Sequence, residues 1–314
     1  MWQLLSLNGI GLQLFCWRLI PCAGGPAGAL RSLANCNWRY PFVRQVMPHC
    51  AAASQQPVFS HSSSAVIAQA PPASAWNGKG TQEDFMYKDE CILVDEKDCI
   101  IGHASKYDTH RFTAQQPKGR LHRAFSVFLF NSQNQLLLQQ RASTKITFPK
   151  VWTNTCCSHP LHGYNPGEVD DPSAVASGAV MGAKRAAVRK LGHELGIPAE
   201  QLPIDGFKFL TRLHYCASDD GTYGPQAEWG EHEIDYILFV KADVHLTPNP
   251  EEVDAVKYVT FPELTSMMQS SSGLLWSPWF RILATHFLDG WWQNVDKTIR
   301  TDEHVDLHTI HKIC

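Results

Sequence analysis

One segment limits the possible folds of this chain more than any other, and it runs from Leu121 to Phe130. Its aromatic and apolar residues favour an extended strand that places Phe125 and Phe128 on opposite faces. Asn131 to Asn134 supplies turn-forming residues, and Gln135 to Arg141 has the composition of a second strand. The stretch as a whole therefore predicts a β-hairpin.

Helical and extended patterns alternate irregularly along the rest of the chain. The apolar stripe from Gly182 to Leu195 predicts a helix that ends at Gly196, and Ser277 with Pro278 predicts the start of a helix that runs past Trp292. We also expect strands at 91–94, 207–217, 234–240 and 256–261, a short helix at 262–269, and a long polar loop that holds Lys106 and His110. This mixture predicts an α/β fold, with one mixed β-sheet flanked by helices.

The amino-terminal part of the chain differs in composition from the rest. It contains arginines, small residues and prolines, but its first acidic residue is Glu83. That composition resembles an organelle presequence, and a disordered extension without an address fits it equally well. We therefore expect a presequence-like or disordered extension at 1–83 and a single catalytic domain at 84–314.

Composition excludes several classes of function. Hydrophobic residues make up 44% of the chain and charged residues 18%, as in globular proteins. The formal net charge of -3 offers no basic excess for binding nucleic acid. No apolar run is long enough for a transmembrane segment. The 10 cysteines show no spacing typical of a disulfide framework, so we expect reduced thiols in an intracellular protein.

Two short segments carry the residues most suited to chemistry. Trp152 to Pro160 places the Cys157 thiol two residues before the His159 imidazole, and Trp229 to Glu233 contains two glutamates two residues apart. In a strand, residues two apart point to the same face. Such a group can form a metal-assisted acid/base site. Each segment also fits a plain structural role, as buried thiols or as a solvated strand face.

With these residues in view, the chain resembles the type I isopentenyl-diphosphate Δ-isomerases, which are relatives of the Nudix hydrolases. The resemblance spans roughly residues 85 to 312 and implies a Nudix-like fold. The matching segments are Leu121–Phe130, Leu136–Arg141, Thr153–Pro160, Glu194–Pro198, Gly230–Tyr236 and Ser277–Phe280. It also implies the reversible conversion of isopentenyl diphosphate to dimethylallyl diphosphate by a 1,3-allylic proton shift, in the supply of isoprenoids and sterols. A monomer in the cytosol or peroxisome is expected from the resemblance, whereas the N-terminus suggests a mitochondrial alternative.

The resemblance also implies a role for individual side chains. Cys157 and Glu233 are expected to transfer protons, Tyr215 to hydrogen-bond the catalytic carboxylate, and Trp279 to face the developing cation. The expected ligands of a Zn²⁺, Mn²⁺ or Mg²⁺ ion are His110, His122, His159, Glu231 and Glu233. The substrate diphosphate is expected to meet Lys106, Arg141, Lys145 and Lys190, with a bridging Mg²⁺ held by Glu194.

Several positions depart from the family pattern and keep two alternatives open. Lys150 stands where a glycine is expected, 162–179 and 223–227 look like insertions, and Gly182 and Gly192 are expected to weaken their helix. One alternative is a catalytically decayed protein that still binds isoprenoid diphosphates. The other is a Nudix diphosphohydrolase, but Lys190 and His193 replace two glutamates that hydrolysis requires.

Overall fold

The computed structural model describes residues 81–313, and the predictions made for residues 1–80 lie outside this part of the chain. Its first element is the helix α1 (Gln82–Lys88), where Thr81 and Asp84 form a reciprocal capping box. This helix crosses the boundary expected at residue 83 and buries Met86, so the folded part begins earlier than predicted. Among the described residues, no helix combines the length and apolarity needed to cross a bilayer.

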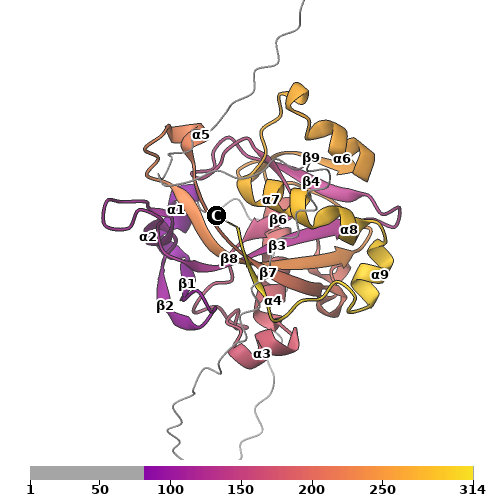
Figure 1. Ribbon diagram of the computed structural model, residues 1–314, viewed down its shortest axis with the longest axis horizontal. Coiled ribbons are helices and arrows are strands. Elements are labelled where there is room, and N and C mark those ends of the chain that lie inside the picture. The colour runs from indigo at the N-terminus through magenta and orange to yellow at the C-terminus, as the bar shows by residue number, and fades with distance from the viewer. Residues whose placement is uncertain (1–80, 314) are drawn as a thin grey trace, which may run out of the picture. The chain divides into compact units, whose positions relative to one another are not determined.

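The described chain forms a single mixed sheet with helices packed against it (Figure 1). The strands are β1 (Glu90–Val94), β2 (Ile100–Ser105), β3 (His122–Phe130), β4 (Leu136–Arg141), β5 (Trp152–Thr153), β6 (Cys156–Ser158), β7 (Lys208–Ser218), β8 (Gly230–Lys241), β9 (Val253–Val259) and β10 (Ile310–Lys312). The helices after α1 are α2 (Lys106–His110), α3 (Pro172–Ser177), α4 (Met181–Leu195), α5 (Asp220–Tyr223), α6 (Phe261–Met267), α7 (Pro278–His286), α8 (Leu288–Trp292) and α9 (Val295–Arg300). The predicted mixed α/β architecture is confirmed.

The strand β3 is central to the sheet. The main path runs β10-β7-β8-β3-β1-β2, with β3 parallel to β8 and antiparallel to β1 and β6. The predicted hairpin exists only at its turn, since β3 and β4 pair at Phe130 and Leu136 and then diverge. Beyond that pair, β4 joins β9 and β5, whereas β3 joins β6 and β8. The divergence leaves room for the segment Cys156–Ser158 beside β3.

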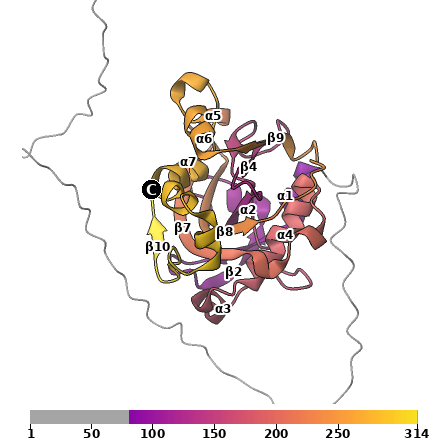
Figure 2. The same cartoon turned by 90° about the vertical axis from the view of Figure 1, so that its right-hand side faces the viewer.

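Two hydrophobic cores lie on opposite faces of the sheet, and Figure 2 shows α4 and α7 on opposite sides of it. One core joins Phe125 on β3 to α4. The other joins Phe128 on β3 to Phe280 on α7 and to the tryptophans of α8. Alternate residues of β3 therefore serve different cores, as the period of a strand requires.

The helix α4 confirms the predicted helix at 182–195 and ends at Gly196, which adopts the left-handed conformation. Gly182 also has a packing role, which its low helix propensity does not indicate. A Cβ atom at that position would lie 2.4 Å from the carbonyl oxygen of Glu168. Gly182 therefore permits a close approach between α4 and the chain before α3, and it is not simply a weak point of the helix.

Two predictions of local structure are wrong. Lys106 and His110 do not lie in a loop, because residues 106–110 form α2, with Ser105 as its N-cap. The helix predicted from Trp279 past Trp292 begins at Pro278 as expected, but it is interrupted at Phe287 and again after Trp292. Short helices that turn at these points wrap one face of the sheet, which a single straight helix does not.

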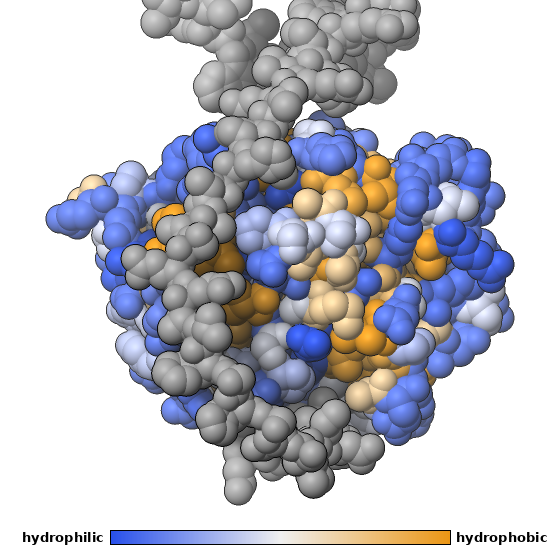
Figure 3. Space-filling view, turned by 90° about the horizontal axis from the view of Figure 1, so that it is seen from below, coloured by the Kyte–Doolittle hydropathy of each residue, from blue (hydrophilic) through white to orange (hydrophobic). Residues whose placement is uncertain are grey.

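Among the described cysteines, Cys91, Cys156 and Cys157 are free thiols, as expected. Apolar side chains also reach the surface, where Figure 3 shows a band of hydrophobic residues between hydrophilic ones. Single exposed apolar residues, such as Ile101 and Leu275, are ordinary on globular proteins and carry no functional conclusion.

Candidate active site

Elements that are distant in sequence bring the predicted metal ligands together at one end of β3 and β8. The parallel pairing of these strands places His122 opposite Glu233. Ser158 ends β6 beside β3, so His159 emerges at the same place. An isolated bridge between Arg111 and Trp229 holds the end of α2, and hence His110, against the start of β8.

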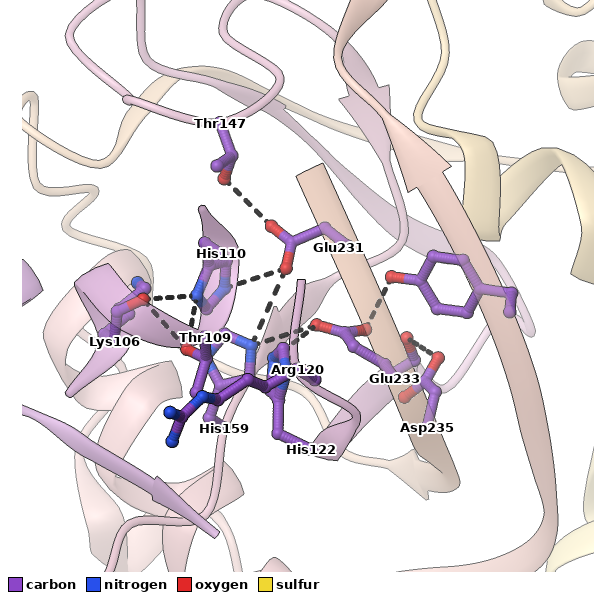
Figure 4. A network of polar contacts seen from close by, with 12 residues as sticks. Lys106, Thr109, His110, Arg120, His122, Thr147, His159, Glu231, Glu233 and Asp235 are labelled. Atoms are coloured by element: carbon purple, nitrogen blue, oxygen red, sulfur yellow. Dashed lines mark hydrogen bonds and ion pairs between the residues drawn. The ribbon is translucent and has the colours of Figure 1, made fainter. Parts of the chain in front are cut away.

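The five predicted ligands form one buried group, and Figure 4 shows their imidazoles and carboxylates pointing toward one another. One potential ligand atom from each of His110, His122, His159, Glu231 and Glu233 lies within 4.8 Å of all the others. The shortest approaches join His110 Nε2 to Glu231 Oε2, at 2.8 Å, and His159 Nε2 to Glu233 Oε1, at 2.9 Å. His122 Nε2 lies 3.7 Å from Glu233 Oε1.

Backbone carbonyls orient two of the three imidazoles. His110 Nδ1 lies 2.7 Å from the carbonyl oxygen of Lys106, and His122 Nδ1 lies 2.8 Å from that of Arg120. A carbonyl oxygen accepts a hydrogen bond from a protonated Nδ1, which leaves the Nε2 lone pair directed at the centre of the group. Outer hydrogen bonds of this kind are typical of histidines that bind metal ions.

The donor set fits a divalent ion. The Nε2 atoms of His110 and His122 and Oε2 of Glu231 are buried without a hydrogen-bond partner. Unpartnered buried polar atoms are costly, and a cation shared among them would satisfy all three. Three imidazoles with two carboxylates suit Zn²⁺, Mn²⁺ or another divalent ion. The described structure is therefore compatible with the predicted metal site.

Each glutamate of the group is held on its far side by a hydroxyl. Thr147 donates to Oε1 of Glu231 at 2.9 Å, and Tyr215 donates to Oε2 of Glu233 at 2.5 Å. Burial alone would raise the pKa of Glu233, but its close approach to His122 and the hydrogen bond from Tyr215 lower it. Glu233 is thus held as a carboxylate. The position of Tyr215 agrees with its prediction, whereas Thr147 was not expected.

Cys157 lines the same small cavity as Glu233 and Tyr215. Burial raises the pKa of the Cys157 thiol to about 12, although the charge of Arg141 acts in the opposite direction. Cys157 is thus a protonated thiol, and Glu233 is ionised. The cavity has a volume of about 20 Å³, which is close to the space for one water molecule.

Trp279 forms another wall of the cavity and is held by the segment that carries Cys157. Its indole Nε1 donates to Oδ1 of Asn154 at 3.2 Å, and the hydroxyls of Thr153 and Ser277 lie 2.8 Å apart. The Arg141 guanidinium carbon is 5.6 Å from the centre of the Trp279 ring. The indole of Trp279 therefore already makes a cation–π contact, with Arg141.

The predicted diphosphate residues lie beside this cavity, and several have carboxylate partners. Lys145 Nζ lies 2.6 Å from Glu252 Oε2, and Lys190 Nζ lies 3.1 Å from Glu194 Oε1. Burial lowers the pKa of Lys145 to about 8, with Glu252 opposing that shift. Glu252 is buried between the two lysines and was not predicted. These ion pairs hold the two lysines in place.

Arg141 and Lys106 complete the predicted basic set. Arg141 donates from Nε to the carbonyl oxygen of Phe148 and from a terminal nitrogen to that of Thr147, so it anchors the loop that carries Thr147. Lys106 lines both the small cavity and a larger cleft of about 760 Å³. The cleft also shares Ser158 and His159 with the cavity, so the two lie next to each other.

Comparisons with known proteins agree with this arrangement. The NUDIX domain model matches residues 120–280, so the chain carries a Nudix domain. Isopentenyl-diphosphate Delta-isomerase I of Clarkia breweri is 49% identical over 236 residues, covering 74% of this chain and 77% of that protein. Isopentenyl-diphosphate Delta-isomerase I of Camptotheca acuminata is 48% identical over 236 residues, covering 74% of this chain and 94% of its own. The chain belongs to the isopentenyl-diphosphate Delta-isomerase family.

Proposed function

We propose that this protein interconverts isopentenyl diphosphate and dimethylallyl diphosphate by a 1,3-allylic proton shift in which Cys157 and Glu233 exchange protons with the substrate. The observation that supports this most directly is a protonated thiol and an ionised carboxylate lining one buried cavity. One group delivers a proton to the terminal alkene carbon, and the other removes a proton from C2. The double bond moves, and the total number of protons is unchanged.

The cation that develops between these steps needs stabilisation without a nucleophile to trap it. The indole of Trp279 offers a π face in the wall of the cavity, held in place by Asn154. A cavity with space for about one water molecule also limits capture of the cation by solvent. We propose that Trp279 supports the cation and that Tyr215 keeps Glu233 correctly oriented through its hydrogen bond.

The five-residue group is proposed to hold Zn²⁺, Mn²⁺ or Mg²⁺. A divalent ion bound there would withdraw charge from Glu233 and tune its acidity. Because the three imidazoles are carried by α2, β3 and the end of β6, they also fix the position of Glu233 at the cavity wall. We expect chelation to abolish turnover while the circular dichroism spectrum is kept. Activity that survives complete removal of divalent ions would contradict this part of the proposal.

We further propose that the substrate diphosphate binds at Lys106, Lys145 and Lys190, with a Mg²⁺ ion held by Glu194. Glu194 is buried, receives a hydrogen bond from Gln139 at 3.0 Å and faces Lys190. The carboxylate of Glu252 lies in the same pocket, where it contacts both Lys145 and Lys190. Two carboxylates and two lysines therefore share this pocket. Such a group can exchange its internal ion pairs for contacts to phosphate and Mg²⁺, which keeps the buried charges paired.

Uptake of deuterium from solvent tests the reaction directly. We expect the full chain, supplied with Mg²⁺ and Zn²⁺, to convert isopentenyl diphosphate to dimethylallyl diphosphate and to introduce deuterium at the methyl and C2 positions, as read by NMR. Cys157→Ala and Glu233→Gln should each reduce turnover below detection. Near wild-type turnover by either variant would remove that residue from the mechanism.

Cys156→Ala provides a matched control because it removes the neighbouring thiol. Cys156 faces the hydrophobic core and not the cavity, so its loss should affect stability more than turnover. The experiment also separates the alternatives. Substrate binding without exchange at C2 would indicate a decayed binding protein, and release of phosphate from nucleoside diphosphate derivatives would indicate a hydrolase.

Location and assembly are also proposals. We propose a monomer that acts in the cytosol or peroxisome, and the arginine-containing stretch before Glu83 motivates a mitochondrial alternative. A fluorescent protein fused to residues 1–80 would separate these: mitochondrial import of the fusion would favour the alternative, and diffuse fluorescence would disfavour it. Sedimentation equilibrium of the full chain tests the monomer.

A further inference from the structure

A second group of potential metal ligands lies outside the candidate active site and has no role in the proposed mechanism. It consists of Glu90, His103 and His162, and one ligand atom from each lies within 4.8 Å of the others. These three residues come from the start of β1, from β2 and from the segment after β6. None of these three residues was predicted from the sequence as a metal ligand.

Backbone contacts hold these three elements next to one another. The antiparallel register pairs Ile92 with His103, so His103 is a diagonal neighbour of Glu90 on the same face of the ribbon. The amide of His162 donates to the carbonyl oxygen of Glu90 at 2.8 Å, directly beside an isolated bridge between Cys91 and Leu161. The three side chains are therefore brought together by the main chain.

The donor atoms converge on one carboxylate oxygen. Glu90 Oε2 lies 2.8 Å from His103 Nδ1 and 3.4 Å from His162 Nδ1. The two imidazole rings stack with their centres 3.9 Å apart and nearly parallel, at 4°. Two imidazole nitrogens and one carboxylate oxygen are therefore close enough together to share a single divalent ion.

We propose that Glu90, His103 and His162 form a second binding site for a divalent transition-metal ion of the Zn²⁺ type. Two imidazoles and one carboxylate are a common ligand set for Zn²⁺, and nitrogen donors disfavour Mg²⁺ and Ca²⁺. The side chains are 44–46% exposed, so the rings are free to tilt out of their stack and direct both lone pairs at one ion. That exposure also leaves room for water at a fourth position.

An ion at this site would act on the segment that carries His159. Residues 159–162 connect the active-site histidine to the second site, and the bridge between Cys91 and Leu161 already fastens them to β1. Occupation of the second site adds a side-chain link between this segment, β1 and β2. We therefore infer that the second ion stabilises the loop after β6 without entering the reaction.

Metal stoichiometry tests the proposal independently of catalysis. The full chain is stripped with a chelator and titrated with Zn²⁺ in competition with a chromophoric chelator. We expect His103→Gln, His162→Gln and Glu90→Gln each to bind one Zn²⁺ fewer than the wild type. His122→Ala disrupts the candidate active site and should lose a different Zn²⁺ ion. The double variant His122→Ala with His103→Gln should therefore bind two Zn²⁺ ions fewer than the wild type.

His308→Gln is a matched control, because His308 is exposed and belongs to neither ligand group. It should bind as many Zn²⁺ ions as the wild type. Unchanged stoichiometry in His103→Gln and His162→Gln would overturn the proposal, as would a loss in only one of them. Unchanged stoichiometry in His122→Ala alone would refute the proposed function's metal site and leave the second site to be judged on its own variants. Circular dichroism confirms that each variant is folded.

Discussion

Tyr215 controls the state of Glu233 through one short hydrogen bond, and its removal gives a prediction with a definite sign. Tyr215→Phe keeps the ring in the cavity wall but deletes the 2.5 Å contact to Glu233 Oε2. We expect kcat to fall roughly 10- to 100-fold, the effect of losing a hydrogen bond to a charged group. Because that bond lowers the pKa of Glu233, the acid limb of the pH–rate profile should move to higher pH.

Tyr236→Phe is the matched control for this experiment. Tyr236 lies on β8 and also donates a 2.5 Å hydrogen bond to a carboxylate, that of Asp98, which has no place in the candidate site. Its loss should reduce the stability of the fold and leave the acid limb where it is. An equal displacement of the acid limb in both variants would mean that Tyr215 acts through general stability and not through Glu233.

The residues that were missed share a physical reason. Thr147, Asn154 and Glu252 act through contacts across the fold: to Glu231, to Trp279 and to the two lysines. Such partners lie far apart in sequence. A single threonine or asparagine belongs to no local sequence pattern that indicates a long-range contact. The predicted site residues were found because their segments match a family. Spacing alone reveals neither His110 nor His122.

Lys150 tests a departure from the family pattern at the level of the backbone. Its φ of 61° lies in the left-handed region, where a glycine carries no steric penalty and an ordinary side chain does. Its side chain is exposed, so Lys150→Gly should stabilise the protein by about 1 kcal/mol, as measured by urea unfolding. Asn134→Gly, at an exposed residue with a φ of 59°, should gain less because asparagine tolerates this conformation.

A stability gain at Asn134 equal to that at Lys150 would show that the left-handed lysine is not strained. The family resemblance predicts a glycine at position 150, and the positive φ of Lys150 supplies the physical basis of that prediction. The sequence thus shows that position 150 departs from the family pattern, but it does not show the backbone angle at that position.

At the scale of one element, α4 contains two buried glycines that should respond in opposite ways to alanine. At Gly182, a Cβ would lie 2.4 Å from the Glu168 carbonyl oxygen, so Gly182→Ala should destabilise the protein by about 2–3 kcal/mol. At Gly192, the nearest contact would be 3.5 Å, to the carbonyl oxygen of Ile197. Gly192→Ala should therefore stabilise by about 0.5–1 kcal/mol. Thermal unfolding of both variants tests this prediction. Stabilisation by Gly182→Ala would show that α4 can move away from the Glu168 carbonyl.

The boundaries of the helices show which parts of the secondary structure can be predicted from local sequence patterns and which cannot. The helix α4 was predicted because its apolar stripe and its Gly196 cap agree, and α7 because Ser277 and Pro278 mark its start. The helix α2 was missed because its five residues are too short for a periodic stripe. The interruption at Phe287 follows from packing, since Phe287 stacks on Trp291 and contacts His311 of β10, neither of which is visible in local sequence.

At the scale of the whole molecule, the fold class was predictable and the strand order was not. Alternating helices and strands indicate a mixed sheet, and the two faces of β3 were assigned correctly from its period. However, β3 pairs in parallel with β8, a strand more than a hundred residues later. Non-local pairing of this kind depends on which surfaces fit together in three dimensions, so the hairpin prediction correctly identified the turn at 131–134 but not the partners of β4.

The same non-local pairing is stabilised by a buried charge network centred on Asp98. Its carboxylate accepts from Arg123 on β3 at 2.7 Å, from Arg212 on β7 at 3.1 Å and from Tyr236 on β8 at 2.5 Å. Arg212 also donates to the carbonyl oxygen of Leu307, near β10. Asp98→Ala leaves two arginines buried without a carboxylate, and we expect a loss of about 3–5 kcal/mol in the free energy of unfolding.

Asp302→Ala serves as the control, because Asp302 pairs with Lys208 on β7 but is 86% exposed. A surface pair of this kind contributes about 1 kcal/mol or less, so the two variants should differ by several kcal/mol in urea unfolding. The folded Asp98→Ala fraction should retain the proposed isomerase activity, because the network lies outside the cavity that holds Cys157 and Glu233. Equal losses for both variants would mean that solvent reaches the arginines once Asp98 is removed, and the pairing of β8 with β3 and with β7 would then not depend on this network.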